Sequence, residues 1–212
     1  MKSRVVVADD HTVVSEGVRG ILERMGCQVV ASVLDGRALI SAVSELKPDL
    51  VVLDVSMPIL NGIEAARRIR TQNRRVKLIV LSMHTDPVYV REAFRVGANA
   101  YVVKSAAVSE LGKAVEEVMQ GRNYMTSRVN GSQLNAFLSG PPSKSFGNEL
   151  TERQREVLQL VAEGKTGKEI AEVLRISLKT VEFHKARLMD VLGLHTTAEL
   201  TRYAVEHKIV GV

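Results

Sequence analysis

The sequence is poor in cysteine and in aromatic residues, and it contains no tryptophan. Cys27 is the single cysteine among 212 residues, which excludes an internal disulfide and favours a reducing compartment. No apolar run approaches the ~20 residues needed to cross a bilayer. The N-terminus leads directly into a strand-like segment, without the features of a signal peptide. We therefore expect a cytoplasmic protein that does not enter a membrane.

A glycine-rich G-x-G-x-x-G turn is also absent after the first strand-like segment, which counts against dinucleotide binding. The net charge is +5 at pH 7. Such a mild basic excess permits binding to nucleic acid but does not demonstrate it. With 45% apolar residues the chain can form a hydrophobic core, and its length suits two small domains.

Short β-branched-rich runs alternate with amphipathic segments through residues 1–120, which we predict to form one domain. This alternation favours a doubly wound α/β fold, with a five-stranded parallel sheet and helices on both faces. The predicted strands are Arg4–Ala8, Gln28–Val33, Leu50–Leu53, Lys77–Leu81 and Ala100–Val103. The predicted helices lie near Val13–Met25, Gly36–Glu45, Gly62–Thr71, Pro87–Val96 and Val108–Met119.

Charged residues follow three of these strands. Asp9 and Asp10 come after the first, Asp54 after the third and Lys104 after the fifth. The carboxyl ends of parallel strands form the edge where open α/β sheets bind ligands, so these side chains should converge there. An aspartate after a strand often only caps the next turn. The combination of three acids and one lysine favours a functional site.

The same residues, with their neighbours, resemble the receiver domain of two-component response regulators, which has a flavodoxin-like fold. The resemblance covers roughly the first 120 residues and rests on the order and spacing of the whole set. Its members are Asp9, Asp10, Asp54, Met57, Pro58, Asn61, Gly62, Ser82 and Lys104.

The resemblance implies phosphorylation of Asp54 by a sensor histidine kinase, with the carboxylate acting as nucleophile. It also implies a Mg²⁺ ion bound by Asp10 and Asp54, by Asp9 through water, and by the carbonyl of Ser56. Clustered carboxylates need such a counter-charge, and Mg²⁺ favours oxygen ligands. Lys104 would pair with a phosphoryl oxygen.

Two further residues are implied as a conformational switch. The hydroxyl of Ser82 would bond the new phosphoryl group, and Tyr101 would move with it; taken alone, Tyr101 would be a half-buried strand aromatic. His84 is interpreted as a structural or surface residue. Many relatives have a proline after the lysine, often in a cis bond. Here that residue is Ser105, and we expect a trans bond because cis costs ~2.5–4 kcal/mol before a non-proline residue.

Residues 121–149 are rich in glycine, proline and serine, and we predict a flexible linker. The family that the first 120 residues resemble usually has a short helix between its domains, and the resemblance implies it at Ser132–Leu138. The remaining residues, 150–212, are helical in pattern. Thr151 with Gln154 predicts a capping box before the first helix, and Gly164 ends that helix. The next helices are predicted at Lys168–Leu174, from Ser177 to about Leu192, and from Thr196 to about His207.

This all-α four-helix segment describes a helix-turn-helix domain. From Leu150 to about Val205 it is very similar to the LuxR-type DNA-binding domain, and the two halves together resemble response regulators of the NarL/FixJ class. That resemblance implies binding to duplex DNA as a homodimer, through the last helix. Gly167 stands where relatives often have asparagine, which predicts weaker capping of the second helix.

The third C-terminal helix should bury Ile176, Val181, Leu188 and Leu192 and direct another face to the major groove. Lys179, Lys185 and Arg187 suit phosphates. Glu182 could accept from a cytosine amine but must overcome repulsion by the phosphates, and the alternative is a solvated side chain. The candidate DNA-contacting residues are Lys179, Thr180, Glu182, Phe183, His184, Lys185, Ala186 and Arg187.

These features predict a phosphorylation-dependent DNA-binding transcriptional regulator that is not an enzyme. Two alternatives belong to other classes. A phosphatase of the haloacid dehalogenase type would want a second aspartate two residues after the nucleophile, where this chain has Ser56. An adaptor would have the same receiver domain but an output domain that binds protein instead of DNA.

Overall fold

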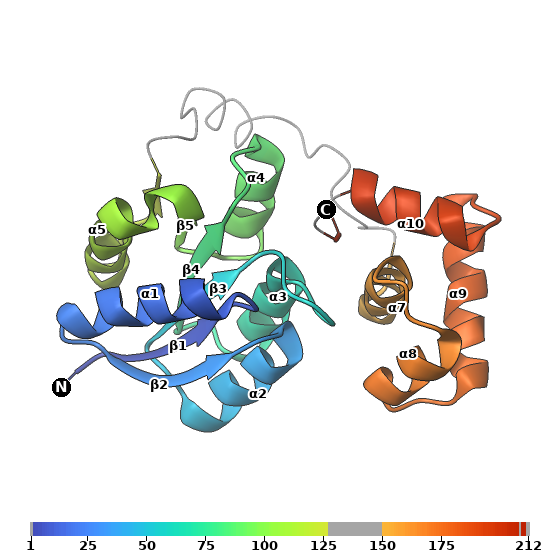
Figure 1. The fold of residues 1–212 in the computed structure, drawn as a ribbon, viewed down its shortest axis with the longest axis horizontal. Helices are drawn as coiled ribbons and strands as arrows, with labels where there is room; N and C mark the ends of the chain where they lie inside the picture. The colour runs from blue at the N-terminus through green and yellow to red at the C-terminus, as the bar shows by residue number, and fades with distance from the viewer. Residues whose placement is uncertain (1, 127–149, 208, 211–212) are drawn as a thin grey trace. The chain divides into compact units, whose positions relative to one another are not determined.

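The structure is a computed structural model that describes residues 2–126, 150–207 and 209–210 (Figure 1). The chain divides into two compact units, Met1–Pro141 and Pro142–Val212. Most of the predicted linker, including the possible helix at Ser132–Leu138, lies outside the described residues.

The first unit contains a parallel sheet in the order β2-β1-β3-β4-β5-β6 (Figure 1). All five predicted strands are present, two of them one residue longer than predicted. The strands are β1 (Arg4–Ala8), β2 (Gln28–Val33), β3 (Leu50–Asp54), β4 (Lys77–Ser82), β5 (Ala100–Val103) and β6 (Tyr124–Met125).

The sixth strand corrects the prediction of five. β6 has two residues and pairs with Ala100 and Tyr101 of β5. The backbone N–H of Tyr124 donates to the carbonyl of Asn99 at 3.1 Å, and that of Thr126 to the carbonyl of Tyr101 at 3.0 Å. Two residues are too few to produce a hydrophobic pattern, so this strand depends on an edge that the rest of the sheet provides.

Five helices cover the two faces of the sheet, as right-handed crossovers require. The continuous apolar runs of the strands send alternate side chains into two separate cores: Val5 and Val7 point to one, Val6 and Ala8 to the other. Helices α1 (Thr12–Arg24) and α5 (Ala107–Met119) cover the first core; α2 (Gly36–Leu46), α3 (Gly62–Gln72) and α4 (Pro87–Arg95) cover the second. A 3₁₀ turn, η1 (Lys104–Ala106), follows β5.

The described part of the second unit contains α7 (Glu152–Ala162), α8 (Gly167–Leu174), α9 (Leu178–Leu192) and α10 (Thr197–Glu206) around one apolar core. The predicted capping box at Thr151 is present. The weaker capping predicted at Gly167 is wrong: Thr166 is the N-cap and forms a capping box with Glu169, so Gly167 is the first residue inside the helix.

Candidate functional site

The carboxyl edge of the sheet brings together the acids and the lysine at the ends of β1, β3 and β5. The Nζ atom of Lys104 lies 2.7 Å from Asp9 Oδ2 and 2.8 Å from Asp54 Oδ2. Both aspartates are 2% exposed, and Asp10 beside them is exposed. The Lys104–Ser105 bond is trans, as predicted. Residues from three strands therefore form one charged cluster at the sheet edge.

Burial and the lysine act on this cluster in opposite directions. Burial raises the pKa of Asp54, while the hydrogen bond and the charge of Lys104 lower it without cancelling the rise. Burial would lower the pKa of Lys104, but hydrogen bonds to Asp54 and Asp9 outweigh it and raise that pKa. Lys104 is thus held in its charged form against the Asp54 carboxylate.

The cluster also provides a donor set for a metal ion. Donor atoms of Asp9, Asp10, His11 and Asp54 all lie within 4.8 Å of one another. Carboxylate oxygens are the ligands that Mg²⁺ prefers, so the residues present fit this ion. Sequence reasoning missed His11, although its place directly after the two aspartates was a signal. Its Nδ1 atom lies 2.9 Å from Asp10 Oδ1 and 3.4 Å from Asp9 Oδ1.

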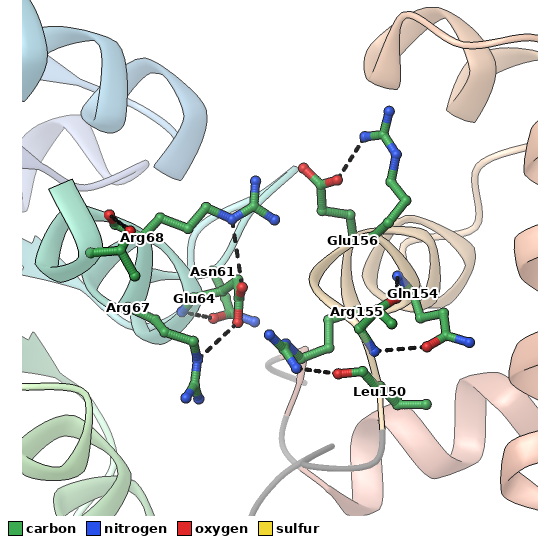
Figure 2. A network of polar contacts seen from close by, with 11 residues as sticks. Asn61, Glu64, Arg67, Arg68, Leu150, Gln154, Arg155 and Glu156 are labelled. Atoms are coloured by element: carbon green, nitrogen blue, oxygen red, sulfur yellow. Dashed lines mark hydrogen bonds and ion pairs between the residues drawn. The ribbon is translucent and has the colours of Figure 1, made fainter.

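Gly62 sets the loop between Asp54 and α3 against the end of β3. A Cβ atom at Gly62 would lie 1.9 Å from the carbonyl oxygen of Asp54, so only glycine permits this approach. Beside it, Asn61 caps α3 by accepting from the N–H of Glu64 at 2.9 Å. Figure 2 shows Glu64 paired in turn with Arg67 at 3.3 Å and Arg68 at 3.5 Å. The start of α3 is therefore anchored directly behind the site.

The two predicted switch residues are both fully buried, at 0% exposure. Ser82 ends β4, and its Oγ accepts from the N–H of His84 at 3.2 Å. The hydroxyl of Tyr101 donates to the carbonyl of His84 at 2.8 Å. Burial raises the pKa of Tyr101. Both residues thus meet at one segment of backbone, after β4.

The His84 side chain links this backbone segment to two further residues. The sequence analysis interpreted His84 as a structural or surface residue and did not predict these contacts. Its Nε2 atom lies 3.4 Å from the Oγ of Ser56. Its ring stacks on Tyr89 of α4, with centroids 4.1 Å apart. No local pattern marks such a residue, because its partners come from loops and helices distant in sequence.

In the second unit, α9 has one face in the core and another exposed. Val181 and Leu188 are buried, and Ile176 and Leu192 pack against the same core. Phe183 is 58% exposed. Among the other candidate DNA contacts, exposed side chains are Lys179, Glu182, Ala186 and Arg187, and partly buried ones are Thr180, His184 and Lys185.

The first helix of this unit is fixed by local contacts. Figure 2 shows Glu156 of α7 paired with an arginine, and Arg155 donating to the carbonyl of Leu150. The partner of Glu156 is Arg153, 2.7 Å away, which also donates to the carbonyl of Leu174 at the end of α8 at 3.1 Å. These contacts join α7 to α8 and support the framework on which α9 lies.

Within the described residues, no helix is long and apolar enough to span a bilayer.

Comparison with known proteins gives a family for each half. Residues 5–116 match the response regulator receiver domain, and residues 148–204 match the luxR family of bacterial regulatory proteins. The chain is 36% identical to the oxygen regulatory protein NreC of Staphylococcus aureus, over 98% of this chain and 99% of the relative.

Solved structures agree with this match. RcsB from Salmonella enterica serovar Typhimurium, bound to promoter P1flhDC in the presence of the phosphomimetic BeF3-, is 29% identical. The match covers 96% of this chain and 98% of RcsB, with a TM-score of 0.61. A structure of two RcsB dimers bound to two parallel DNAs is 28% identical over 96% and 98% of the chains, with a TM-score of 0.59. The chain is a phosphorylation-dependent DNA-binding transcription regulator and belongs to the response regulators that join a receiver domain to a LuxR-type helix-turn-helix domain.

Proposed function

We propose that Asp54 is the phosphoacceptor of this regulator, that a sensor histidine kinase is its phosphodonor, and that phosphorylation controls binding of α9 to duplex DNA by a homodimer. The domains would be residues 1–120 and 150–212, joined by a linker at 121–149. The observation that carries the proposal is the position of Lys104, whose ammonium group lies between Asp9 and Asp54 at the sheet edge.

The proposed reaction is a transfer between two side chains. A carboxylate oxygen of Asp54 attacks phosphorus in line and forms the P–O bond while the P–N bond to the kinase histidine breaks. The released imidazole nitrogen takes up a proton. Lys104, now paired with two carboxylates, would exchange one of them for a phosphoryl oxygen. The charge on the phosphoryl group is thereby matched by a residue already in place.

Asp10, Asp54 and the carbonyl of Ser56 would hold Mg²⁺, with Asp9 acting through water. When bound, Mg²⁺ would neutralise charge on the phosphoryl oxygens. Ser82 would then turn its hydroxyl toward the phosphoryl group and release the N–H of His84, 3.2 Å away. Because Tyr101 bonds the carbonyl of that same residue, the two would respond together.

The DNA-contacting surface would be the solvent-facing side of α9, where Lys179, Phe183, Ala186 and Arg187 are exposed. The two RcsB structures bound to DNA support this assignment, since they match nearly the whole chain. Lys179, Lys185 and Arg187 would contact phosphates, which position the domain, while Phe183 and Ala186 would approach base edges.

The phosphoacceptor is tested by labelling with a small-molecule phosphodonor and Mg²⁺. Wild-type protein should gain an acid-stable phosphoryl group that hydroxylamine releases, and Asp54→Asn should gain none. The matched control is Asp49→Asn, at the opposite end of β3, which should label as the wild type does. Undiminished labelling of Asp54→Asn would contradict the assignment of Asp54 as the phosphoacceptor.

The same preparation separates the remaining classes. We expect no turnover of a generic phosphate ester, whereas a phosphatase would hydrolyse it repeatedly. We also expect binding to duplex DNA that weakens as salt rises, because released counterions drive such binding. A protein that accepts phosphate on Asp54 but binds no DNA would be an adaptor.

A further inference from the structure

The side chain of Glu182 on α9 lies close to Gly167, at the N-terminus of α8. A Cβ atom built on Gly167 would be 3.0 Å from the Oε1 atom of Glu182 and 2.9 Å from the Cδ1 atom of Leu178. The space that a side chain at Gly167 would need is therefore taken by these two groups. The carboxylate of Glu182 is turned toward α8, although its helix position belongs to the face proposed to contact DNA.

The first turn of α8 favours a carboxylate in this place. Its capping box uses the N–H groups of Thr166 and Glu169. Among the described residues, the N–H groups of Gly167 and Lys168 have no hydrogen-bond partner. Unpaired N–H groups give a helix N-terminus a partial positive charge, which attracts an anion within the first turn. The side chain of Glu182 has no hydrogen-bonding or ionic partner in the described part of the chain, so no basic residue of α9 competes for its carboxylate.

The exposed side of α9 also carries an aromatic ring, Phe183, paired with a cation, Arg187. Phe183 is 58% exposed, and the guanidinium of Arg187 lies 5.9 Å from the centre of its ring. An aromatic ring can contact a thymine methyl group, and arginine can bond guanine or a phosphate. A carboxylate directed to the same surface would be repelled by the phosphates of DNA.

We propose that Gly167 sets the affinity of the DNA-binding domain for DNA through its effect on Glu182. By leaving room for the Glu182 carboxylate beside the first turn of α8, it keeps that negative charge away from the phosphates, so that Phe183 can approach the bases and Arg187 a phosphate. This inference rests on the proposed function of α9. It predicts that any side chain at Gly167 acts on DNA binding through Glu182.

The test is a double-mutant cycle with Gly167→Ala and Glu182→Gln in the full-length protein, measured by binding to a duplex selected from a random-site library. Alanine suits a helix better than glycine, and the φ angle of Gly167 is not in the left-handed region. Gly167→Ala should therefore fold, which thermal unfolding checks. The matched control is Gly17→Ala on α1, where a Cβ atom would meet nothing within 4 Å.

With Glu182 present, Gly167→Ala should weaken binding by about tenfold, because it moves a negative charge toward the phosphates. In the Glu182→Gln background the same change should weaken binding by less than about twofold, because an amide carries no charge. Glu182→Gln alone should leave the selected sequence preference unchanged. An equal loss in both backgrounds, or no loss in either, would overturn the proposal.

A measurement without DNA tests the contact by itself. In nuclear magnetic resonance spectra of the free protein, Glu182→Gln should shift the amide signals of Gly167 and Lys168 but not that of Gly193, at the far end of α9. Unchanged signals would overturn the inference whatever the DNA result. If the signals shift but the wild type binds no duplex DNA, the function proposed for α9 fails while the Gly167–Glu182 contact stands.

Discussion

At the scale of single residues, this protein depends on polar side chains that join segments far apart in the sequence. Lys104 joins β1 and β3 at the sheet edge. Arg70, near the C-terminus of α3, joins that helix to the segments before β4 and before β5. It donates to the carbonyls of Gly97 at 2.9 Å, Asn73 at 3.1 Å and Val76 at 2.6 Å, and to Oδ1 of Asn99 at 3.0 Å. Replacing Lys104 or Arg70 is therefore expected to affect the receiver domain more than replacing a surface lysine or arginine would.

Replacing Arg70 should destabilise the receiver domain. Arg70→Met keeps much of the apolar stem but leaves several partly buried carbonyl groups without a donor, which costs on the order of 3 kcal/mol in total. Urea unfolding followed by circular dichroism measures the loss. Arg74→Met, at an exposed position four residues later, should change the free energy of unfolding by less than about 0.5 kcal/mol. Similar values for the two variants would show that the Arg70 bonds contribute little.

Asp54, the proposed phosphoacceptor, should lower the stability of the receiver domain. Because the pKa of Asp54 is raised in the folded state, its contribution to stability is fully present below the unfolded pKa and is lost as pH rises through the folded pKa. At neutral pH the folded protein therefore bears the cost of a buried carboxylate. Asp54→Asn removes that cost, so it should raise the midpoint of thermal unfolding at pH 7.

The gain from Asp54→Asn should shrink when unfolding is measured in acid, below the unfolded pKa of aspartate. A chelator must be present, since bound Mg²⁺ would stabilise only the wild type. Asp49→Asn is the control and should not show the same pH-dependent gain. A gain that is constant with pH would mean that ionisation of Asp54 is not its cause.

At the scale of elements, α9 combines a buried face with an exposed one. Ser177 caps its first turn, accepting from the N–H of Thr180 at 3.1 Å, and Gly193 ends it in the left-handed region, at a φ of +64°. Val181 and Leu188 fix its rotation about its own axis, since both are fully buried. Caps and core contacts thus determine which side chains of this helix remain available for DNA.

Lys179, exposed in the first turn of α9, should contact a phosphate. Lys179→Ala should weaken binding to all duplexes alike and reduce the slope of log affinity against log salt by about one. Titrations at several salt concentrations, with one selected and one unrelated duplex, measure both effects. Lys2→Ala, exposed in the receiver domain, should change neither. A loss confined to the selected duplex would assign base reading to Lys179 instead.

At the scale of the whole molecule, the protein couples a chemical change in one domain to binding by another. We propose that the receiver accepts the phosphoryl group at the sheet edge and that α9 of the second unit binds the major groove. Its relatives RcsB and NreC match both halves in one chain. The coupling is therefore expected to show only in the full-length protein.

Phosphorylation should raise the affinity for duplex DNA and the fraction of dimer on it. Fluorescence anisotropy and analytical ultracentrifugation, with and without phosphodonor, measure the two quantities. Chelating Mg²⁺ or introducing Asp10→Ala should prevent both changes while leaving the circular dichroism spectrum intact. If Asp10→Ala accepts phosphate at the normal rate, Asp10 is not a required ligand.

The sequence by itself determined the elements and the class of the protein. Strand runs such as Leu50–Leu53 and the capping box at Thr151 depend on interactions among a few neighbouring residues. Their patterns can therefore be recognised in the sequence without a structure. The order of Asp9, Asp54 and Lys104 along the chain predicted one cluster, because parallel strands end at a common edge.

Only the tertiary structure decided features that depend on contacts between distant segments. β6 forms because it can pair with the edge strand β5, and the position of the His84 ring is set by its contacts with Ser56 and Tyr89. The turn of Glu182 toward Gly167 likewise needs the crossing of α8 and α9, which no periodicity records. Local patterns specify which residues form an element and which face is apolar; the packing of elements decides what each remaining side chain meets.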